Sequence, residues 1–325
     1  MKISRRQFVK AMAAMSAASM LAACGGNSGS GSSGGKKALT FQIWDVAQKE
    51  GMEAMCAAYT QQHPEVSIEV QVTSWNEYWT KLEAAATSNQ MPDIFWMHTN
   101  EILKYADNGM LADCSDIVEK DKFSEISLSN AMGSNGTLYA VPKDKDTVGL
   151  VYNKEMFDAA GVAYPDESWT WDDLVSASEK IYAATGKYGY MAYADDQLGY
   201  WNFVYQAGGY ILNEDKTKAG FTQPATEKAM KFYIGLQQND WCPDQTYFAE
   251  TAPGTAFFSE KGAMFLEGDW NILAELQNYP EMVGKWDVAV LPKCPDPESG
   301  DGRATISNGL CYATAASNKN LDTVK

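Results

Sequence analysis

Short apolar segments alternate with amphipathic segments along most of this chain. The apolar segments have the length and residue types of strands, and the amphipathic ones have the periodicity of helices. Strands that alternate with helices predict an α/β sheet with mostly right-handed crossovers. We expect strands at residues 39–44, 66–73, 92–96, 147–153, 188–193, 263–267 and 286–291, and helices at residues 50–63, 75–89, 101–108, 154–160, 171–185, 200–206, 223–238 and 269–278.

Glycines follow three of the expected helices. Gly109, Gly161 and Gly186 stand where a left-handed residue closes a helix. Ser168 or Thr170 precedes the helix that begins at Trp171, so we expect one of them to cap it.

The first residues of the chain have the order of an export signal. MKISRRQFVK carries four positive charges, and residues 11–23 form an apolar run that is too short to cross a bilayer. Leu21-Ala-Ala-Cys24 has the form of a bacterial lipobox, in which the signal is cut before a cysteine that is then lipidated. We therefore expect a signal peptide over residues 1–23 and a lipid on Cys24, the alternative being a buried structural cysteine. Residues 4–10 resemble a twin-arginine export signal, with an ordinary Sec signal as the alternative.

Residues 24–37 are expected to form a lipidated cysteine and a tether. Gly, Ser and one Asn make up residues 25–35, a composition that stays a flexible coil with a reach of about 18 Å. The mature protein should therefore be held on the extracytoplasmic face of the cell membrane by its lipid anchor alone.

Charge and composition exclude several kinds of partner. The net charge of the whole chain is −16, and removing the four basic residues of the signal makes the mature protein still more acidic, which argues against nucleic acid. Arg303 is the single arginine outside residues 1–23, which favours a neutral or cationic ligand over an anionic one. The two histidines and six cysteines form no CxxC or HxxxH pair, so we expect no metal site and no cofactor.

Nine segments occur in one order along the chain: FQIWD, MPDIFWMHTN, NGMLAD, GTLYAVPKDKDTVGLVYNKEMF, WTWDDL, QAGGYI, FSEKGAMFLEGDWN, VAVLPK and ATAASNKN. Together they resemble the sugar-binding lipoproteins of ATP-binding-cassette importers, the group that includes maltodextrin-binding protein. The resemblance implies a type II periplasmic-binding-protein fold, in which two α/β lobes enclose a ligand cleft and close by hinge motion. It also implies a monomer that delivers its ligand to the transmembrane subunits of an ABC permease.

The resemblance also implies where the lobes divide. Lobe 1 would comprise residues 38–146 and about 291–325, and lobe 2 residues 147–290, with crossings at residues 147–153 and near residues 288–291. Members of the family continue beyond the segment that ends this sequence at Lys325. We therefore expect lobe 2 to lack its C-terminal helices.

Aromatic and polar residues at the ends of expected strands are candidates for ligand contact. Trp44 and Asp45 follow the first strand, and Trp96 and Asn100 lie at and after the third, at the edge where open α/β sheets bind ligands. Aromatic faces stack on sugar rings, and carboxylates accept hydrogen bonds from hydroxyl groups. Asp269 is a further candidate acceptor.

Four more candidates come from the resemblance. Asp146 matches a carboxylate that contacts sugar in relatives, Asp196 and Trp201 lie near family contacts, and Trp270 matches a stacking aromatic residue. Trp75 and Trp79 are four residues apart and so lie on one face of the expected helix. We expect both in the core rather than in contact with a ligand.

Other carboxylates have structural interpretations. Asp93 follows a proline and opens a strand, and Asp172 and Asp173 lie in the first turn of a helix, where negative charge is favourable.

Two other classes of protein remain as alternatives. A secreted carbohydrate-active enzyme would need a pair of carboxylates, such as Asp144 with Asp146 or Glu267 with Asp269. A structural lipoprotein would need no ligand. We expect a binding protein without catalytic residues, whose ligand is a sugar or, as the alternative, a polyamine or another non-sugar solute.

Overall fold

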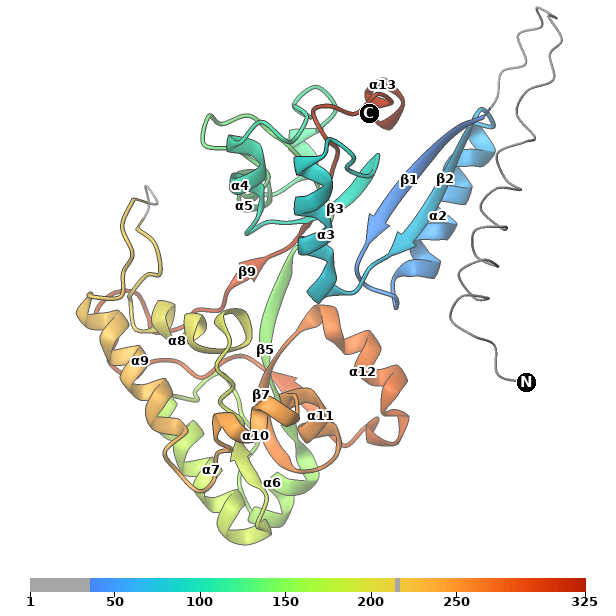
Figure 1. Ribbon diagram of the computed structural model, residues 1–325. Helices are drawn as coiled ribbons and strands as arrows, with labels where there is room; N and C mark the ends of the chain where they lie inside the picture. Colours follow the sequence, from blue (N-terminus) through green and yellow to red (C-terminus); the bar gives the residue numbers. More distant parts are fainter. Residues whose placement is uncertain (1–35, 214–216) are drawn as a thin grey trace, which may run out of the picture.

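Two separate sheets form the centres of two lobes in the computed structural model, which describes residues 36–213 and 217–325 (Figure 1). The predicted signal peptide, Cys24 and the tether up to residue 35 lie outside the described residues. The predicted α/β class is confirmed, because helices alternate with the strands of both sheets.

The sheet of lobe 1 has the strand order β2-β1-β3-β10-β4. β1 pairs in parallel with β2 and β3, whereas β10 is antiparallel to β3 and β4. The strands are β1 Lys37–Ile43, β2 Val66–Val72, β3 Ile94–His98, β4 Val141–Pro142 and β10 Leu310–Ala313. The helices are α2 Lys49–Gln62, α3 Trp75–Thr87, α4 Ile102–Asp107, η1 Lys120–Lys122, α5 Glu125–Asn130 and α13 Leu321–Val324.

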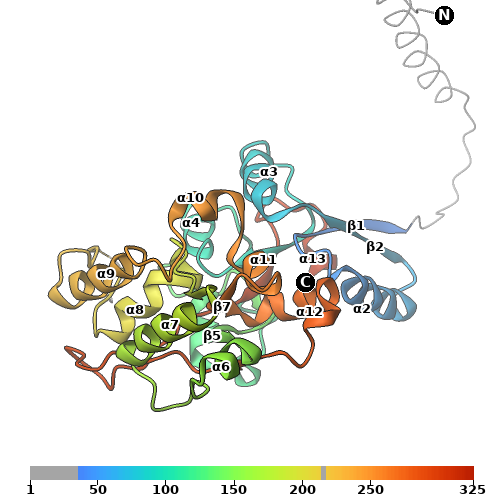
Figure 2. The ribbon, with the colours of Figure 1, turned by 90° about the horizontal axis from the view of Figure 1, so that it is seen from below.

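The sheet of lobe 2 has the strand order β6-β7-β5-β8, and only its β6–β7 pair is parallel. α7 packs on β6 and α11 packs on β7 (Figure 2). The strands are β5 Asp146–Asn153, β6 Tyr188–Tyr190, β7 Gly262–Gly268 and β8 Trp286–Ala289. The helices are α6 Lys154–Ala160, α7 Trp171–Thr185, η2 Asp196–Tyr200, α8 Trp201–Gln206, α9 Pro224–Leu236, α10 Gln245–Glu250, α11 Pro253–Phe258, η3 Asp269–Asn271, α12 Ile272–Asn278 and η4 Pro280–Met282.

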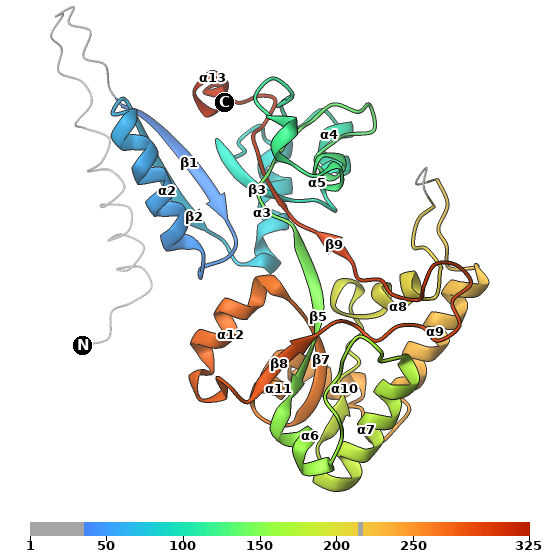
Figure 3. The same ribbon diagram turned by 180° about the vertical axis from the view of Figure 1, so that it is seen from behind.

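Two strands carry the chain between the lobes and lie side by side (Figure 3). The first is β5, and the second is β9, Ser307–Asn308. They are antiparallel partners, with Asp146 opposite Asn308 and Thr147 opposite Ser307.

The second crossing lies later than the sequence analysis placed it. Residues 286–289 form β8, which pairs with β5 inside the sheet of lobe 2. Leu291, Cys294 and Ile306 are buried in the core of the same lobe. The chain therefore stays in lobe 2 until β9, because these apolar side chains complete its core rather than that of lobe 1.

Local sequence signals end the helices as predicted. Gly109, Gly161 and Gly186 all have positive φ. Thr170 caps α7, and Asp173 completes a capping box with it.

Asp93 has the structural role that was expected for it. Its side chain accepts hydrogen bonds from the Thr40 backbone (2.9 Å) and from the Asn320 amide (2.9 Å). It thereby fixes β1 to the C-terminal segment of lobe 1.

None of the helices within residues 36–213 and 217–325 has both the length and the apolar character needed to cross a bilayer. The cysteines at positions 56, 114, 242, 294 and 311 are all buried and free.

Candidate functional site

A cavity of about 430 Å³ lies between the two lobes, next to the crossing strands. Lobe 1 contributes Trp44, Asp45, Gln48, Trp75, His98 and Leu310, the crossing strands contribute Asp146 and Asn308, and lobe 2 contributes Asp195, Gln197, Leu198, Trp270, Asn271 and Ala274. Both lobes and both crossings therefore line one space.

A second cavity of about 320 Å³ lies within lobe 1, with an apolar lining that includes Leu39, Phe41 and Tyr59. We take the cavity between the lobes as the candidate site, because it combines aromatic faces with convergent polar groups.

Aromatic residues of lobe 1 form one wall of the cavity. The rings of Trp44 and Trp75 meet edge to face, with their centroids 5.2 Å apart. Trp44 also rests on Tyr78 and Trp96 at 4.9 Å and 5.1 Å. Trp75 is 42 % exposed, so part of its ring is free to contact a ligand. The buried rings behind Trp44 hold it in place.

The opposite wall comes from the turn between β7 and α12. Trp270 lies in this turn, and its ring passes so close to Gly268 that a Cβ atom there would lie 2.3 Å from it. The Glu267 carboxylate accepts hydrogen bonds from the Gly268 backbone (2.8 Å) and the Asn271 amide (2.9 Å). Burial, more than the nearby Glu275 and Asp195, raises the pKa of Glu267 to about 7.

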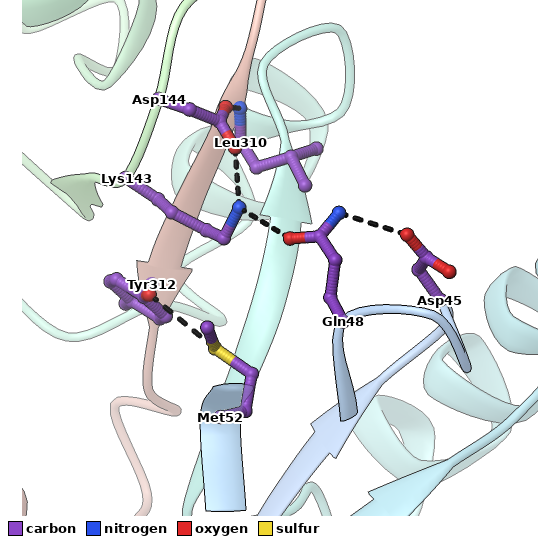
Figure 4. Close-up of polar contacts among 7 residues, drawn as sticks. All are labelled: Asp45, Gln48, Met52, Lys143, Asp144, Leu310 and Tyr312. Atoms are coloured by element: carbon purple, nitrogen blue, oxygen red, sulfur yellow. Dashed lines mark hydrogen bonds and ion pairs between the residues drawn. The ribbon is translucent and has the colours of Figure 1, made fainter. Parts of the chain in front are cut away.

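A chain of polar contacts joins the cavity to the sheet of lobe 1 (Figure 4). Asp45 accepts from the Gln48 amide (2.9 Å), and Gln48 in turn accepts from Lys143 Nζ (3.1 Å). Lys143 also pairs with Asp144, whose carboxylate accepts from the Leu310 backbone (2.6 Å). This lysine is therefore paired, and the contacts tie the start of α2 to β10 and to the loop before β5.

Two carboxylates of the cavity, Asp146 on a crossing strand and Asp195 in lobe 2, have raised pKa values. Burial first, and then the negative charges of Asp144 and Asp269, raise the pKa of Asp146 to about 7, against the opposing effect of Lys143. Burial also raises the pKa of Asp195, whose side chain accepts from the Leu198 backbone (2.7 Å) at the start of η2. The cavity is thus acidic, and it can accept hydrogen bonds from hydroxyl or ammonium groups.

A hydrogen-bonded group lies where the lobes meet. The Asn308 amide is 3.3 Å from His98 Nε2 and also bonds the Gln197 side chain. The Asn100 backbone N–H donates to His98 Nδ1 at 3.2 Å. His98 belongs to lobe 1, Gln197 to lobe 2 and Asn308 to the second crossing, so this group connects all three parts.

Four of the nine predicted contact residues line the cavity: Trp44, Asp45, Asp146 and Trp270. They come from different parts of the sequence and meet because the ends of β1, β5 and β7 converge at the crossing.

The structure does not place the other five predicted residues, Trp96, Asn100, Asp196, Trp201 and Asp269, among the residues that line the cavity. Trp96 is fully buried under Trp44, since β3 is covered on both faces. Asn100 is exposed beyond the end of β3. Asp196 bonds its neighbour's backbone, Trp201 packs against the core of lobe 2, and exposed Asp269 accepts from the Thr147 backbone (3.2 Å).

Sequence reasoning missed several lining residues. Trp75 was expected in the core, but it lines the cavity. Trp79, one helical turn later, does pack against the core of lobe 1. His98 ends β3, and the rule that ligands bind at strand ends could have found it. Gln197, Asn271 and Asn308 carried no sequence signal. In the described part of the chain, no cluster of histidine, cysteine and acidic side chains is arranged to hold a metal ion.

Two curated binding proteins are similar in sequence to this chain. The lactose-binding protein of Rhizobium radiobacter is 25% identical over 291 residues, which are 86% of this chain and 67% of that protein. The diacetylchitobiose-binding protein DasA of Streptomyces coelicolor is 25% identical over 336 residues, which are 97% of this chain and 76% of that protein.

Solved structures share the fold. An ABC substrate-binding protein of Listeria monocytogenes, solved with cycloalternan, has a TM-score of 0.77 at 24% identity, covering 89% of this chain and 73% of that one. The GacH receptor of Streptomyces glaucescens has a TM-score of 0.78 at 24% identity, covering 89% and 74%. These likenesses confirm the predicted type II periplasmic-binding-protein fold.

The sequence model described as "Bacterial extracellular solute-binding protein" matches residues 44–325. The match includes every residue that lines the cavity between the lobes. The chain therefore belongs to the family of bacterial extracellular solute-binding proteins.

Proposed function

We propose that this protein captures a sugar or oligosaccharide between its lobes and delivers it to an ABC permease by hinge closure, while a lipid on Cys24 holds it at the membrane. The family is defined by solute binding and not by a reaction. The alternative of a secreted carbohydrate-active enzyme is accordingly set aside.

The lining of the cavity carries this proposal. Trp44 and Trp75 face it from lobe 1 and Trp270 from lobe 2, with carboxylates of Asp146 and Asp195 close by. A sugar ring has flat C–H faces that stack on indole rings, and hydroxyl groups that donate to carboxylates. A ligand held between rings from both lobes would favour the closed arrangement, which is what hinge closure requires.

The names of the relatives point to the same class of ligand. The two curated relatives described above are named for lactose and diacetylchitobiose, and a relative from Bacillus subtilis is named for arabino-oligosaccharides. The Listeria and Streptomyces structures were solved with cycloalternan and acarbose. All of these ligands contain linked sugar or sugar-like rings.

Thermal unfolding of the purified protein with a panel of ligands tests the proposal. The panel is lactose, diacetylchitobiose, maltotriose, arabinotriose and spermidine. A ligand that binds only the folded state raises the melting temperature by mass action. We expect one of the sugars to do so, and the shift to disappear in Trp270→Ala but to persist in Phe221→Ala, which removes an exposed aromatic side chain outside the cavity.

Two results would count against a sugar ligand. A shift with spermidine alone would assign the acidic cavity to a polyamine. If the protein unfolds cooperatively and none of the sugars raises its melting temperature, a sugar ligand would be excluded.

The anchor has its own test. Cys24→Ala removes the thiol that would carry the lipid, so the variant should move from the membrane fraction to the soluble fraction of the cells or medium. Cys56→Ala, at a buried cysteine of lobe 1, is the matched control. Equal membrane association of both variants and the wild type would exclude lipidation at Cys24.

A further inference from the structure

Asn202 is a polar side chain in the interior of lobe 2, where it lies near the start of α8 and is 0 % exposed. Its NH₂ group donates to the backbone carbonyls of Gln197 (2.7 Å) and Gly199 (3.2 Å), in the short helical segment before α8. Its side-chain oxygen accepts from the backbone N–H of Ile306 at 2.9 Å, directly before β9. One buried amide therefore joins two segments that are about a hundred residues apart in the sequence.

The partners of Asn202 allow only one orientation of its amide. The carbonyl oxygens of Gln197 and Gly199 can only accept, and the Ile306 N–H can only donate. A half turn of the amide would place acceptor against acceptor and donor against donor. The NH₂ group therefore holds the segment before α8, and the oxygen holds the segment before β9.

The segment on the NH₂ side of Asn202, residues 195–199, forms part of the cavity between the lobes. Three of its residues line that cavity: Asp195, Gln197 and Leu198. The Gln197 side chain also bonds Asn308 of the second crossing. Because Asn202 bonds the backbone of Gln197 itself, it limits where the Gln197 side chain can lie.

The segment on the oxygen side of Asn202 leads to both crossing strands. Ile306 directly precedes β9, which is the second crossing. The Thr305 hydroxyl group lies 3.2 Å from the Asn202 oxygen and 3.0 Å from the carbonyl oxygen of Val148 in β5, and it shares its hydrogen between these two acceptors. Asn202 is thus bonded directly to the start of the second crossing and, through Thr305, lies next to the first.

We propose that Asn202 is a positioning residue, which fixes the cavity segment 195–199 to the crossing strands and thereby places Gln197 for contact with the solute. This inference rests on the proposed function and goes beyond it, because Asn202 is itself outside the lining of the cavity. A segment that is held in place before the solute arrives loses less freedom on binding, so the affinity is higher.

Asn202→Asp loosens the cavity side of this connection and keeps the crossing side. Aspartate still offers an oxygen to the Ile306 N–H, but it has no NH₂ group and places a second oxygen against the carbonyls of Gln197 and Gly199. With the sugar that stabilises the wild type most, calorimetry should show an affinity loss of about tenfold.

Gln206→Glu is the matched control, at a residue of the same helix that is 1 % exposed. The Gln206 NH₂ group donates to the Ala304 carbonyl (2.9 Å), and its oxygen accepts from Trp171 Nε1 (2.7 Å). Glutamate keeps the acceptor and loses the donor, as in Asn202→Asp, but neither partner belongs to residues 195–199. We expect a similar loss of stability in denaturant titration and an unchanged sugar affinity. An equal affinity loss in both variants would overturn the inference.

A neutral pair of variants keeps the test decisive if a buried carboxylate prevents folding. Asn202→Leu and Gln206→Met replace the same two amides by apolar groups of similar size. The first should lose sugar affinity and the second should not. Full affinity in a folded Asn202→Leu variant would contradict the positioning role.

A double-mutant cycle shows whether Asn202 acts through Gln197. Gln197→Ala removes the side chain that Asn202 is proposed to place, so adding Asn202→Asp to it should cost little further affinity. Added to Trp75→Ala, on the opposite lobe, Asn202→Asp should keep its full effect. Losses that add fully in the Gln197→Ala background would show that Asn202 does not act through Gln197, and a merely structural role would give this result.

The possible results separate this inference from the function on which it rests. If the wild type binds a sugar and Asn202→Asp folds and binds it equally well, the positioning role is wrong and the function stands. If none of the sugars binds the wild type, both are overturned.

Discussion

Trp270 reaches the cavity because the residue two positions before it has no side chain. A Cβ atom at Gly268 would lie 2.3 Å from the indole ring. Gly268→Ala should therefore displace the ring and weaken sugar binding by about tenfold, similar to the loss of one aromatic contact. Calorimetry measures this effect. Gly51→Ala is the control, because it lies in α2 with no atom near its Cβ position, and it should bind normally. Equal affinity of both variants would refute the steric role of Gly268.

Asp146 makes the stability of the protein depend on pH. Its pKa is about 7 in the folded protein, above its ordinary value of 3.8, so the folded state holds this proton more tightly than the unfolded chain. The free energy of unfolding therefore falls as the pH rises through this window. Asp146→Asn replaces the titrating carboxyl group by an amide that is neutral at every pH. The melting temperature of this variant relative to that of the wild type should therefore rise from pH 4 to pH 8.

Asp116→Asn is the control for this pH dependence. A hydrogen bond from Lys325 lowers the pKa of Asp116 below 3.8. The pH range over which Asp116 affects stability therefore lies below that of Asp146. The difference in melting temperature between this variant and the wild type should stay nearly constant from about pH 5 to pH 8, because the carboxyl group is ionised there in both the folded and the unfolded state. A constant difference for Asp146→Asn as well would show that its proton is not held more tightly in the folded state.

Single residues show how far sequence alone can locate the site. Trp44 and Asp45 follow the carboxyl end of β1, and the rule for open sheets applies to them directly. Asp146 is the first residue of β5, so this rule does not reach it, and only the family resemblance pointed to it. Trp96 also stands near a strand end, but β3 is covered on both faces, and alternation cannot reveal this. Asp195 lines the cavity in place of Asp196: Asp195 caps η2, and the Asp196 side chain accepts from the Gln197 backbone.

At the scale of elements, α7 depends on its first residue. The Thr170 side chain and backbone contact the Asp173 carboxylate at 2.7 Å and 2.8 Å, which completes the capping box. Thr170→Ala should lower the free energy of unfolding by about 1 kcal/mol. Denaturant titration measures this loss. Sugar affinity should be unchanged, because Thr170 does not line the cavity. An unchanged free energy of unfolding would mean that α7 does not need this cap.

Elements differ in how well their sequence predicts their partners. A strand was expected at residues 286–291 and none at residues 310–313, yet β8 joins the sheet of lobe 2 and β10 joins that of lobe 1. Periodicity identifies a strand but not the strand beside it. Tertiary packing determines which sheet each strand joins, because Leu291 and Ile306 complete the core of lobe 2 before the chain crosses to lobe 1. For the same reason the sequence could not place Asn308 at the hinge.

At the scale of the whole molecule, binding and closure should occur together. A sugar held between Trp44 and Trp270 contacts both lobes, so it favours the arrangement in which they are closer. Small-angle scattering should show a smaller radius of gyration after the sugar is added. Trp270→Ala at the same sugar concentration should show no change. Tight binding with an unchanged radius would contradict closure.

The pairing of β5 with β9 restricts how the lobes can move. Two strands joined by the pairs Asp146–Asn308 and Thr147–Ser307 form a narrow ribbon. Such a ribbon bends out of its own plane easily, whereas bending within the plane would stretch its hydrogen bonds. We therefore expect relative motion of the lobes to be largely a rotation about one axis. Groups near this axis move little during the rotation, and the indole rings farther from it move more. If a solute binds between those rings as proposed, its thickness would set the angle at which rotation stops, and the shape of the closed form would depend on the size of the solute.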